Sequence, residues 1–364
     1  MPRNLKIDHL WTVKTYPPDV EFNFSFSNME FLLEDHELPF DRDSIRLHAF
    51  PGDARVGSRH LLETLSRREQ VPEENIFLSL GTSLANFTFW AALLRRGDEV
   101  LVEFPAYEPM FKVPAYLGAR LRFVKRDPLD FSLTVQSFAE VLSDKTRMII
   151  LTDSHNPSGS QLSAEVLQYL RQLSRERGII VFIDEVYSRF YRERSLFVDY
   201  PEFIVTSSLS KFLGLGSLRA GWAFAPAALV EKALNFSDYL TPEIPFAPLY
   251  LTHLLLSSPV LVELEKRVRQ RVKANREIIG AFLNQTEFLS CYIPKNGVLF
   301  FPEVRTRVDI KKFYGHLYKK YRMVVTEGRF FQMPHHFRMA GIWAPEVMKA
   351  GLRRLELALR DSST

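Results

Sequence analysis

Short apolar runs alternate with amphipathic stretches between about residues 75 and 225, and this alternation is the strongest constraint on the fold of the 364-residue chain. Strands that alternate with helices build a mainly parallel sheet whose two faces are both covered by helices. Ligands bind such sheets at the carboxyl ends of the strands, so we expect functional side chains just after residues 80, 151, 183 and 205. The predicted strands are 76–80, 99–102, 120–124, 147–151, 179–183, 203–205 and 221–224, and the predicted helices are 84–94 and 164–177.

The pattern changes after about residue 255, where a long charged helix is predicted over 259–284. Mixed elements follow, which is typical of a second, smaller α+β domain. We therefore predict an N-terminal arm (1–30) packing on the small domain, a large ligand-binding α/β domain (31–255) and a small C-terminal domain (256–364). The later elements predicted are strands at 298–301 and 338–342 and helices at 310–321 and 345–359.

The composition excludes several kinds of binding partner and indicates the cellular compartment. The formal net charge is +4, and basic residues are interleaved with acidic ones, which indicates solvated helix faces and no nucleic-acid partner. Cys291 is the single cysteine, so an internal disulfide and a Cys-rich metal site are excluded, and His335-His336 is too sparse for zinc. The polar segment 1–20 lacks the apolar core of a signal peptide, and no stretch is long and apolar enough to span a membrane. A cytoplasmic protein without a metal or a membrane partner is expected.

Lys211 lies in the segment Ser-Ser-Leu-Ser-Lys-Phe-Leu-Gly (207–214), just after a predicted strand. Its amine can form a Schiff base with an aldehyde, while the hydroxyls of Ser208 and Ser210 and the fork of Arg219 can hold a phosphate. Pyridoxal 5'-phosphate carries both groups. A lysine in a strand-end loop is more often only a surface charge, so the case depends on four further segments.

Two of these segments come early in the chain. Gly81-Thr82-Ser83 joins a predicted strand to a helix, where glycine permits a tight turn and the free amides of the helix favour an anion. A simple helix cap is the alternative for this tripeptide. Tyr107 follows another strand and could stack on a flat ring, although a lone aromatic residue there more often serves packing.

The other two segments follow the predicted strands that end at residues 151 and 183. Asn156 lies in the loop Asn-Pro-Ser-Gly and can donate to a phenolate oxygen, although Asn-Pro turns are common. Asp184 can pair with a protonated ring nitrogen, and Tyr187 can bond the ring phenolate. Helix capping is the alternative for Asp184. Each segment alone is weak evidence for a pyridoxal-phosphate site. Together, in this order and at strand ends, the segments are a specific signal for one.

With these motifs, the chain resembles the fold-type I pyridoxal-phosphate enzymes over about residues 27–359, specifically the class I/II aminotransferases. The histidinol-phosphate aminotransferase branch looks nearest. The resemblance implies catalytic roles for Lys211 (Schiff base and proton shuttle), Asp184 (ring nitrogen) and Tyr187 (ring oxygen, with Asn156). The predicted cofactor-binding residues are Gly81, Thr82, Ser83, Tyr107, Asn156, Asp184, Tyr187, Ser208, Ser210, Lys211 and Arg219.

The resemblance also covers the substrate side of the site. Arg338, in the motif Phe-Arg-Met-Ala, matches the arginine that clamps the α-carboxylate of the substrate, and Asn28 belongs to the N-terminal substrate segment. The family is usually a homodimer with active sites at the subunit interface. Two departures stand out: Phe50 occupies the place of a tyrosine that often reaches the neighbouring subunit's phosphate, and segment 25–30 matches the family only loosely.

We therefore predict transfer of an amino group between an L-amino acid and a 2-oxo acid (EC 2.6.1.-) through a Schiff base on Lys211. Decarboxylation, C–S or β-elimination and cyclisation stay open, because the same lysine and aspartate serve all of them. A non-catalytic pyridoxal-phosphate-binding protein is a less favoured alternative. Regulators of that kind carry a DNA-binding helical domain before the enzyme-like part, which here begins near Ser27. The sequence does not specify which amino acid and oxo acid are used.

Overall fold

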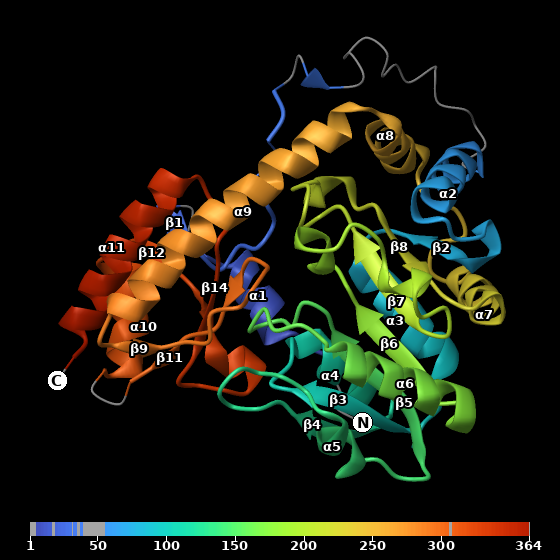
Figure 1. Cartoon of the computed structure of the whole chain (residues 1–364), viewed down its shortest axis with the longest axis horizontal. Helices are drawn as coiled ribbons and strands as arrows, with labels where there is room; N and C mark the ends of the chain where they lie inside the picture. Colours follow the sequence, from blue (N-terminus) through green and yellow to red (C-terminus); the bar gives the residue numbers. More distant parts are fainter. Residues whose placement is uncertain are drawn as a thin grey trace.

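A seven-stranded sheet forms the centre of the larger part of the molecule (Figure 1). The computed structural model describes residues 5–16, 19–30, 32–34, 37–38, 55–305 and 308–363. The order of the strands is β2-β8-β7-β6-β5-β3-β4. Their bounds are β2 Ile76–Ser79, β3 Glu99–Phe104, β4 Arg120–Lys125, β5 Thr146–Thr152, β6 Ile180–Asp184, β7 Ile204–Ser208 and β8 Gly221–Phe224.

The strands β7, β6, β5, β3 and β4 pair in parallel, whereas β8 runs antiparallel to both of its neighbours, β7 and β2. The connection from β7 to β8 contains only the 3-10 helix Gly216–Leu218, too little structure to cross the sheet, so β8 returns beside β7 in the opposite direction. The predicted α/β fold with a mainly parallel sheet is confirmed. The sequence pattern had not indicated which strand is reversed.

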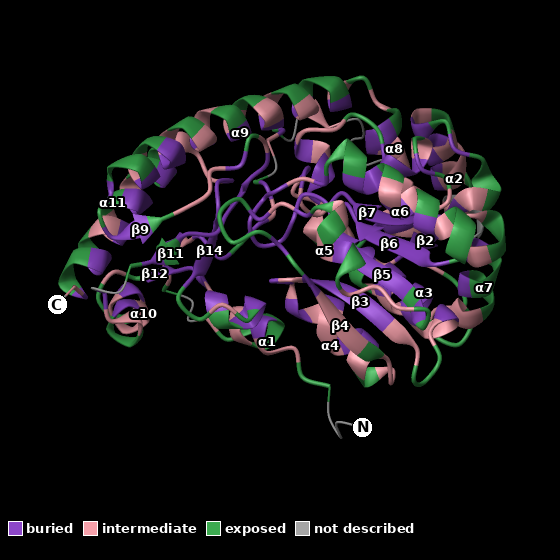
Figure 2. Cartoon of the chain, turned by 60° about the horizontal axis from the view of Figure 1, so that its bottom comes forward, coloured by how far each residue is buried: buried purple, intermediate pink, exposed green. Residues whose placement is uncertain are grey.

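Successive residues of the central strands enter different cores, as expected for a sheet covered on both faces. Ile150 of β5 and Phe182 of β6 pack under α3 (Thr82–Leu93), α4 (Glu108–Tyr116) and α7 (Ala227–Ser237). Their neighbours Ile149 and Val181 belong to the opposite core, and Figure 2 shows these strands buried between helices with exposed outer faces. The helices that contribute to this opposite core include α2 (Arg55–Glu69), α5 (Val135–Ala139), α6 (Ala164–Arg177), α8 (Phe246–Ser257) and the first half of α9 (Val260–Gln285).

The long helix α9 (Val260–Gln285) leads from the sheet to a smaller α+β part (Figure 1). The hydrophobic core of this smaller part is formed around α10 (Ile310–Lys319) and α11 (Pro345–Asp361). A three-stranded antiparallel sheet, β10-β14-β13, carries Arg338. The short strands here are β9 Leu289–Ser290, β10 Leu299–Phe300, β11 Glu303–Val304, β12 Met323–Val324, β13 Thr326–Glu327 and β14 Phe337–Ala340.

The N-terminal segment runs back to this smaller part. Strand β1 (Phe22–Asn23) pairs in parallel with β12, and Phe22 and Phe24 are buried in the same core. Phe26 is 40% exposed, so the alternating aromatic residues form a strand only at their beginning. The short helix α1 (Asp8–Lys14) lies beside α4, because Lys112 forms ion pairs with Asp8 and Glu108.

Among the described residues, no single helix has the length and apolar character needed to cross a membrane. Helices α8 and α9 combine that length with that apolar character only as a pair, which is bent by 85° at its junction.

Candidate active site

A cavity of about 540 Å³ lies at the carboxyl ends of β5, β6 and β7, where the sheet faces α1 and β14. Helix α1 contributes four residues to its wall, and the segment 25–28 contributes all of its residues. Gly81 lies directly beside this cavity, next to Thr82. The other predicted site residues all line it: Asn28, Thr82, Ser83, Tyr107, Asn156, Asp184, Tyr187, Ser208, Ser210, Lys211, Arg219 and Arg338.

The amine of Lys211 points to the N-terminal segment. Its Nζ lies 2.8 Å from Asn28 Oδ1 and 3.1 Å from Ser27 Oγ. Ser27 Oγ lies in turn 2.7 Å from the hydroxyl of Tyr187. The sequence had placed Ser27 only within a loosely matching segment, so its contact with Lys211 is a finding of the structure.

An anion cradle forms where β2 meets α3. Gly81 has a φ of +82°, and a Cβ there would lie 2.3 Å from Arg219 Nη2, so only glycine lets the guanidinium lie over the start of α3. Thr82 Oγ1 is buried and has no hydrogen-bond partner among the described residues. A phosphate would satisfy this hydroxyl, the free amides of α3 and the Arg219 fork together, so the residues present fit the phosphate of the cofactor.

Asp184 is the last residue of β6, and its carboxylate is held from two sides. Asn86 Nδ2 donates to Oδ2 at 2.9 Å, and the Val186 amide donates to Oδ1 at 3.0 Å. Burial nevertheless raises the pKa of Asp184 to about 6. No helix begins at Asp184, so the capping alternative is wrong. A buried carboxylate of this kind is suited to a cationic partner such as a protonated ring nitrogen.

The hydrogen bond from Asn86 to Asp184 is a second contact that was not predicted from the sequence. Asn86 lies on α3 and accepts a hydrogen bond from Thr206 Oγ1 at 2.8 Å, so its amide is oriented with the nitrogen toward Asp184. Nothing in the α3 sequence distinguishes this asparagine from a surface residue of a helix.

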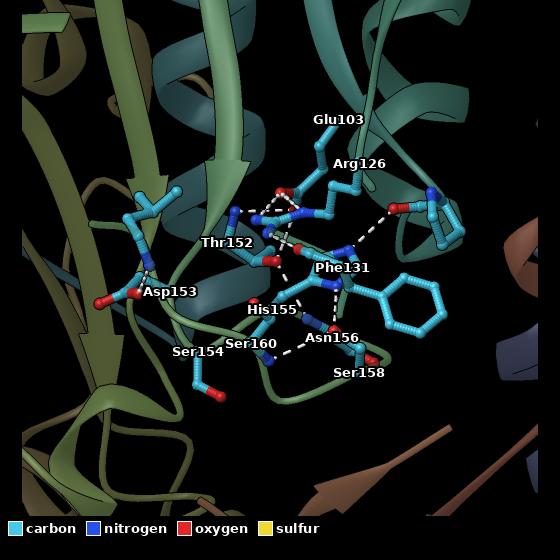
Figure 3. A network of polar contacts seen from close by, with 12 residues as sticks. Glu103, Arg126, Phe131, Thr152, Asp153, Ser154, His155, Asn156, Ser158 and Ser160 are labelled. Carbon is cyan, nitrogen blue, oxygen red and sulfur yellow. Dashed lines mark hydrogen bonds and ion pairs between the residues drawn. The ribbon is translucent and has the colours of Figure 1, made fainter. Parts of the chain in front are cut away.

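Asn156 is positioned by a buried polar network (Figure 3). The backbone amide of Asn156 donates to Thr152 Oγ1 at 3.1 Å. Thr152 donates through both its hydroxyl and its backbone amide to Glu103 Oε1. Glu103 Oε2 accepts from Nε and Nη2 of Arg126 at 3.0 and 2.6 Å, and both side chains are fully buried. The ion pair therefore fixes the start of the loop that carries Asn156.

Arg338 faces the same cavity from β14 and is 3% exposed. Its Nη1 donates to Asn156 Oδ1 at 3.0 Å, and its Nη2 donates to the carbonyl of Ser25 at 2.8 Å and to Thr326 Oγ1. Among the described residues its Nε has no hydrogen-bond partner. A buried cation with a free donor is suited to the carboxylate of a ligand. Because Asn156 Oδ1 accepts from Arg338, the side-chain nitrogen Nδ2 of Asn156 is left to donate to a ligand in the cavity.

Helix α1 closes one side of the cavity with His9, Leu10, Val13 and Lys14. The ring of His9 stacks on Phe330 at 5.4 Å between centroids. Burial lowers the pKa of His9 well below its usual value, so the ring is neutral. Helix α1 was not predicted from sequence, because its seven residues lie in a polar segment without a clear period.

Arg59 and His336 do not line this cavity. The side chain of Arg59 is 80% exposed and pairs with Glu63 on the surface. His336 stacks on Phe301 at 4.8 Å outside the cavity lining. Phe50 lies outside the described residues.

Comparison with known proteins gives a family model and a group of relatives. The model of the family described as aminotransferase class I and II matches residues 55–355. Capreomycidine synthase of Streptomyces vinaceus is 26% identical over 328 residues, which cover 87% of this chain and 82% of that protein. Aspartate aminotransferase of Pyrococcus abyssi is 24% identical, with 83% and 81% covered. Histidinol-phosphate aminotransferase of Methanocella arvoryzae is 28% identical over 239 residues, which cover 64% of this chain and 62% of that relative.

Solved structures share the fold. A pyridoxal-phosphate-dependent aminotransferase from Streptococcus suis superposes with a TM-score of 0.90 at 19% identity, and both chains are covered completely. An aromatic aminotransferase from Pyrococcus horikoshii superposes with a TM-score of 0.84 at 23% identity, with 97% of this chain and 98% of that chain covered.

Proposed function

Since the chain belongs to the class I and II aminotransferases, whose cofactor is pyridoxal 5'-phosphate, we propose that it performs its amino transfer in the cavity around Lys211. One observation carries this assignment. The amine of Lys211, the carboxylate of Asp184 and the guanidinium of Arg338 line one cavity together with the Gly81–Arg219 anion cradle. The substrates are an L-amino acid and a 2-oxo acid.

The residues that would hold the cofactor follow from their chemistry. The phosphate fits Thr82, Ser83 and Arg219, and Ser208 and Ser210 line the same cavity. Asp184 would pair with the ring nitrogen, and Tyr107 would stack on the ring. When bound, the cofactor supplies an aldehyde for Lys211 and a ring that accepts electrons from the α-carbon of the substrate.

The chain's own residues then divide the remaining work. Arg338 would bind the α-carboxylate with its free Nε and so fix the α-carbon near Lys211. Lys211 Nζ would take the proton from the α-carbon and return it to the cofactor carbon that is bonded to the transferred nitrogen. Asn156 and Tyr187 would donate to the ring oxygen, and Asp184 would keep the ring nitrogen protonated.

The variant Lys211→Ala tests the assignment. We expect turnover to fall by at least about 10³-fold, since both the covalent link and the proton acceptor are lost, while cofactor still binds through the anion cradle. The measurements are the absorbance of the cofactor-loaded protein and its change on adding single amino acids and then a 2-oxo acid. Normal turnover in this variant would disprove the proposed role of Lys211.

A second candidate is another reaction at an amino acid, such as decarboxylation, elimination or cyclisation. It is favoured by the match to capreomycidine synthase, which covers 87% of this chain and carries a name other than aminotransferase. A requirement for an added 2-oxo acid in steady-state turnover distinguishes the two candidate reactions. Amino transfer needs an oxo-acid acceptor in every cycle, whereas the other reactions proceed without one.

Finer features of the assignment are also proposals. Matches at 27–28% identity support a histidinol-phosphate aminotransferase branch, although each covers less than three quarters of the chain. We also propose a homodimer in the cytoplasm, and the domain division 1–30, 31–255 and 256–364. The family resemblance supports the dimer, and the position of α9 between the two parts supports the division.

A further inference from the structure

Ser27 occupies a position that the proposed mechanism does not use. Its side chain is buried, it lines the cavity, and its single hydroxyl contacts both Lys211 Nζ and the Tyr187 hydroxyl. The segment that carries it is anchored on both sides. The carbonyl of Ser25 accepts from Arg338, and Asn28 Oδ1 accepts from Lys211. The hydroxyl of Ser27 is therefore held between two groups of the proposed site.

The direction of the two hydrogen bonds from Lys211 follows from the inventory of donors. An ammonium group has only protons to give, so Ser27 Oγ and Asn28 Oδ1 accept from Lys211. Either oxygen can donate in the bond between Ser27 and Tyr187. When Tyr187 gives its own proton to an acceptor in the cavity, the proton between the two oxygens is that of Ser27. The chain of donors runs from Lys211 through Ser27 to Tyr187.

We propose that Ser27 is a positioning residue, whose hydroxyl accepts from the Lys211 amine when that amine is free and donates to Tyr187, so that the Tyr187 proton is directed to the ring oxygen of the cofactor. This inference rests on the proposed function. Hydrogen bonds in series strengthen one another, so donation from Ser27 makes Tyr187 a stronger donor. A stronger donor stabilises the anionic ring oxygen and eases loss of the proton that this oxygen shares with the Schiff base.

Other charged and titratable groups line the same cavity, but within the part of the chain that the structure describes none of them forms a hydrogen bond with the side chain of Ser27. A change at Ser27 thus acts through Tyr187 and Lys211. These groups are His9 and Lys14 of α1, Tyr107 at the start of α4, Asp184 of β6, Arg219 before β8 and Arg338 of β14.

The test is a pH titration of the absorbance of the cofactor-loaded protein, without substrate. We expect Ser27→Ala to raise the pKa of the lysine-bound chromophore by about half a pH unit, since a bond in series strengthens its neighbour by roughly a tenth to a third. Ser27→Thr keeps the hydroxyl and should restore the wild-type value. With a good amino acid, Ser27→Ala should lower kcat about three- to tenfold and leave KM within about twofold, because Arg338 is unchanged.

The variant Tyr187→Phe supplies the matched background. In Tyr187→Phe protein, adding Ser27→Ala should shift the chromophore by less than a third of its effect in wild type. An unchanged or lowered pKa in Ser27→Ala, or an equal shift in both backgrounds, would overturn the proposal. If Ser27→Ala does not fold, Ser27→Cys replaces the hydroxyl by a weak donor and carries the same expectation.

Failure of the proposed function has a different signature. In that case the wild-type protein forms no Lys211-dependent chromophore, or the chromophore does not respond to amino acids. A wild-type protein that passes both checks, with Ser27→Ala unshifted, contradicts the role of Ser27 alone.

Discussion

Asp184 shows at the residue scale how a site for a cationic ligand is built into the sheet. Burial raises the pKa of its carboxyl from the ordinary value of 3.8 to about 6, although Asn86 and the Val186 amide donate to it. The folded state therefore binds this proton more tightly than the unfolded chain does. It follows that the contribution of Asp184 to the free energy of unfolding falls as the pH rises from about 4 to about 6, and it stays unfavourable above that range.

We expect Asp184→Asn to stabilise the cofactor-free protein at pH 8 by about 1–3 kcal/mol, because the uncharged amide removes the cost of a buried charge. The gain should shrink below about pH 5, where Asp184 is protonated in the folded state. Chemical denaturation of both proteins at pH 5 and pH 8 measures it. A difference in stability that does not change with pH would contradict the argument. The variant should also lose turnover, since the ring nitrogen loses its partner.

Arg338 gives a prediction about substrate binding. Its fork donates to Asn156, the Ser25 carbonyl and Thr326 while its Nε stays free, and a lysine ammonium has neither the reach nor the geometry to replace all of these. We expect Arg338→Lys to raise KM for the amino acid about 10- to 100-fold. Steady-state kinetics and spectral titration with the amino acid measure the change. An unchanged KM would place the carboxylate elsewhere.

At the scale of elements, the ends of three strands hold the loop around Asn156. Glu103 lies in β3, Arg126 follows β4 and Thr152 ends β5, so one buried ion pair ties adjacent strands to the site (Figure 3). Arg126 also donates to the carbonyl of Phe131, which packs beside Phe330 and Phe331. The pair therefore links the sheet to aromatic residues next to His9.

Removing one member of this pair leaves the other charge buried and unpaired. We expect Glu103→Gln to lower the free energy of unfolding by about 3–5 kcal/mol. Replacing both residues by leucine should cost less than the single variant, because no isolated charge then remains. Urea unfolding of the two variants and wild type compares them. A double variant less stable than Glu103→Gln would show that the pair contributes more than the cost of burying its charges.

At the scale of the whole molecule, the cavity lies where the sheet, the N-terminal segment and β14 meet. A second hollow of about 660 Å³ lies beside β2 and α7, and it is lined by apolar side chains that include Leu234 and Leu240. Tyr239, between them in sequence, is 90% exposed. Exposed apolar residues gathered at one place mark interaction surfaces, which supports the proposed homodimer.

We expect light scattering during gel filtration to give twice the chain mass of 42.3 kDa. Leu234→Glu should weaken the dimer at least about tenfold, since Leu234 is exposed and lines this hollow, so a charge there would have to be desolvated at the interface. Leu129→Glu is the matched control, because Leu129 is 83% exposed and does not line this hollow. A monomeric wild-type protein, or equal effects of both substitutions, would contradict this interface.

The sequence alone determined the features that depend on local pattern and strand order. Short apolar runs predicted the strands, and the long helix predicted over 259–284 agrees closely with α9. Since parallel strands end at one edge of a sheet, residues as distant as Thr82, Asp184 and Lys211 could be expected around one cavity. Helix α4 escaped prediction because it is short and contains Pro109 and Pro114.

Only the tertiary structure decided which distant residues complete the cavity. Ser27 reaches Lys211 across 184 residues of sequence, and Asn86 reaches Asp184 across 98. His9 enters the same cavity from a helix of seven residues. Such contacts leave no periodic signal, because each is a single side chain whose partner is set by how the N-terminal segment and α3 pack against the sheet. The direction of β8 was decided in the same way, by the short connection that follows β7.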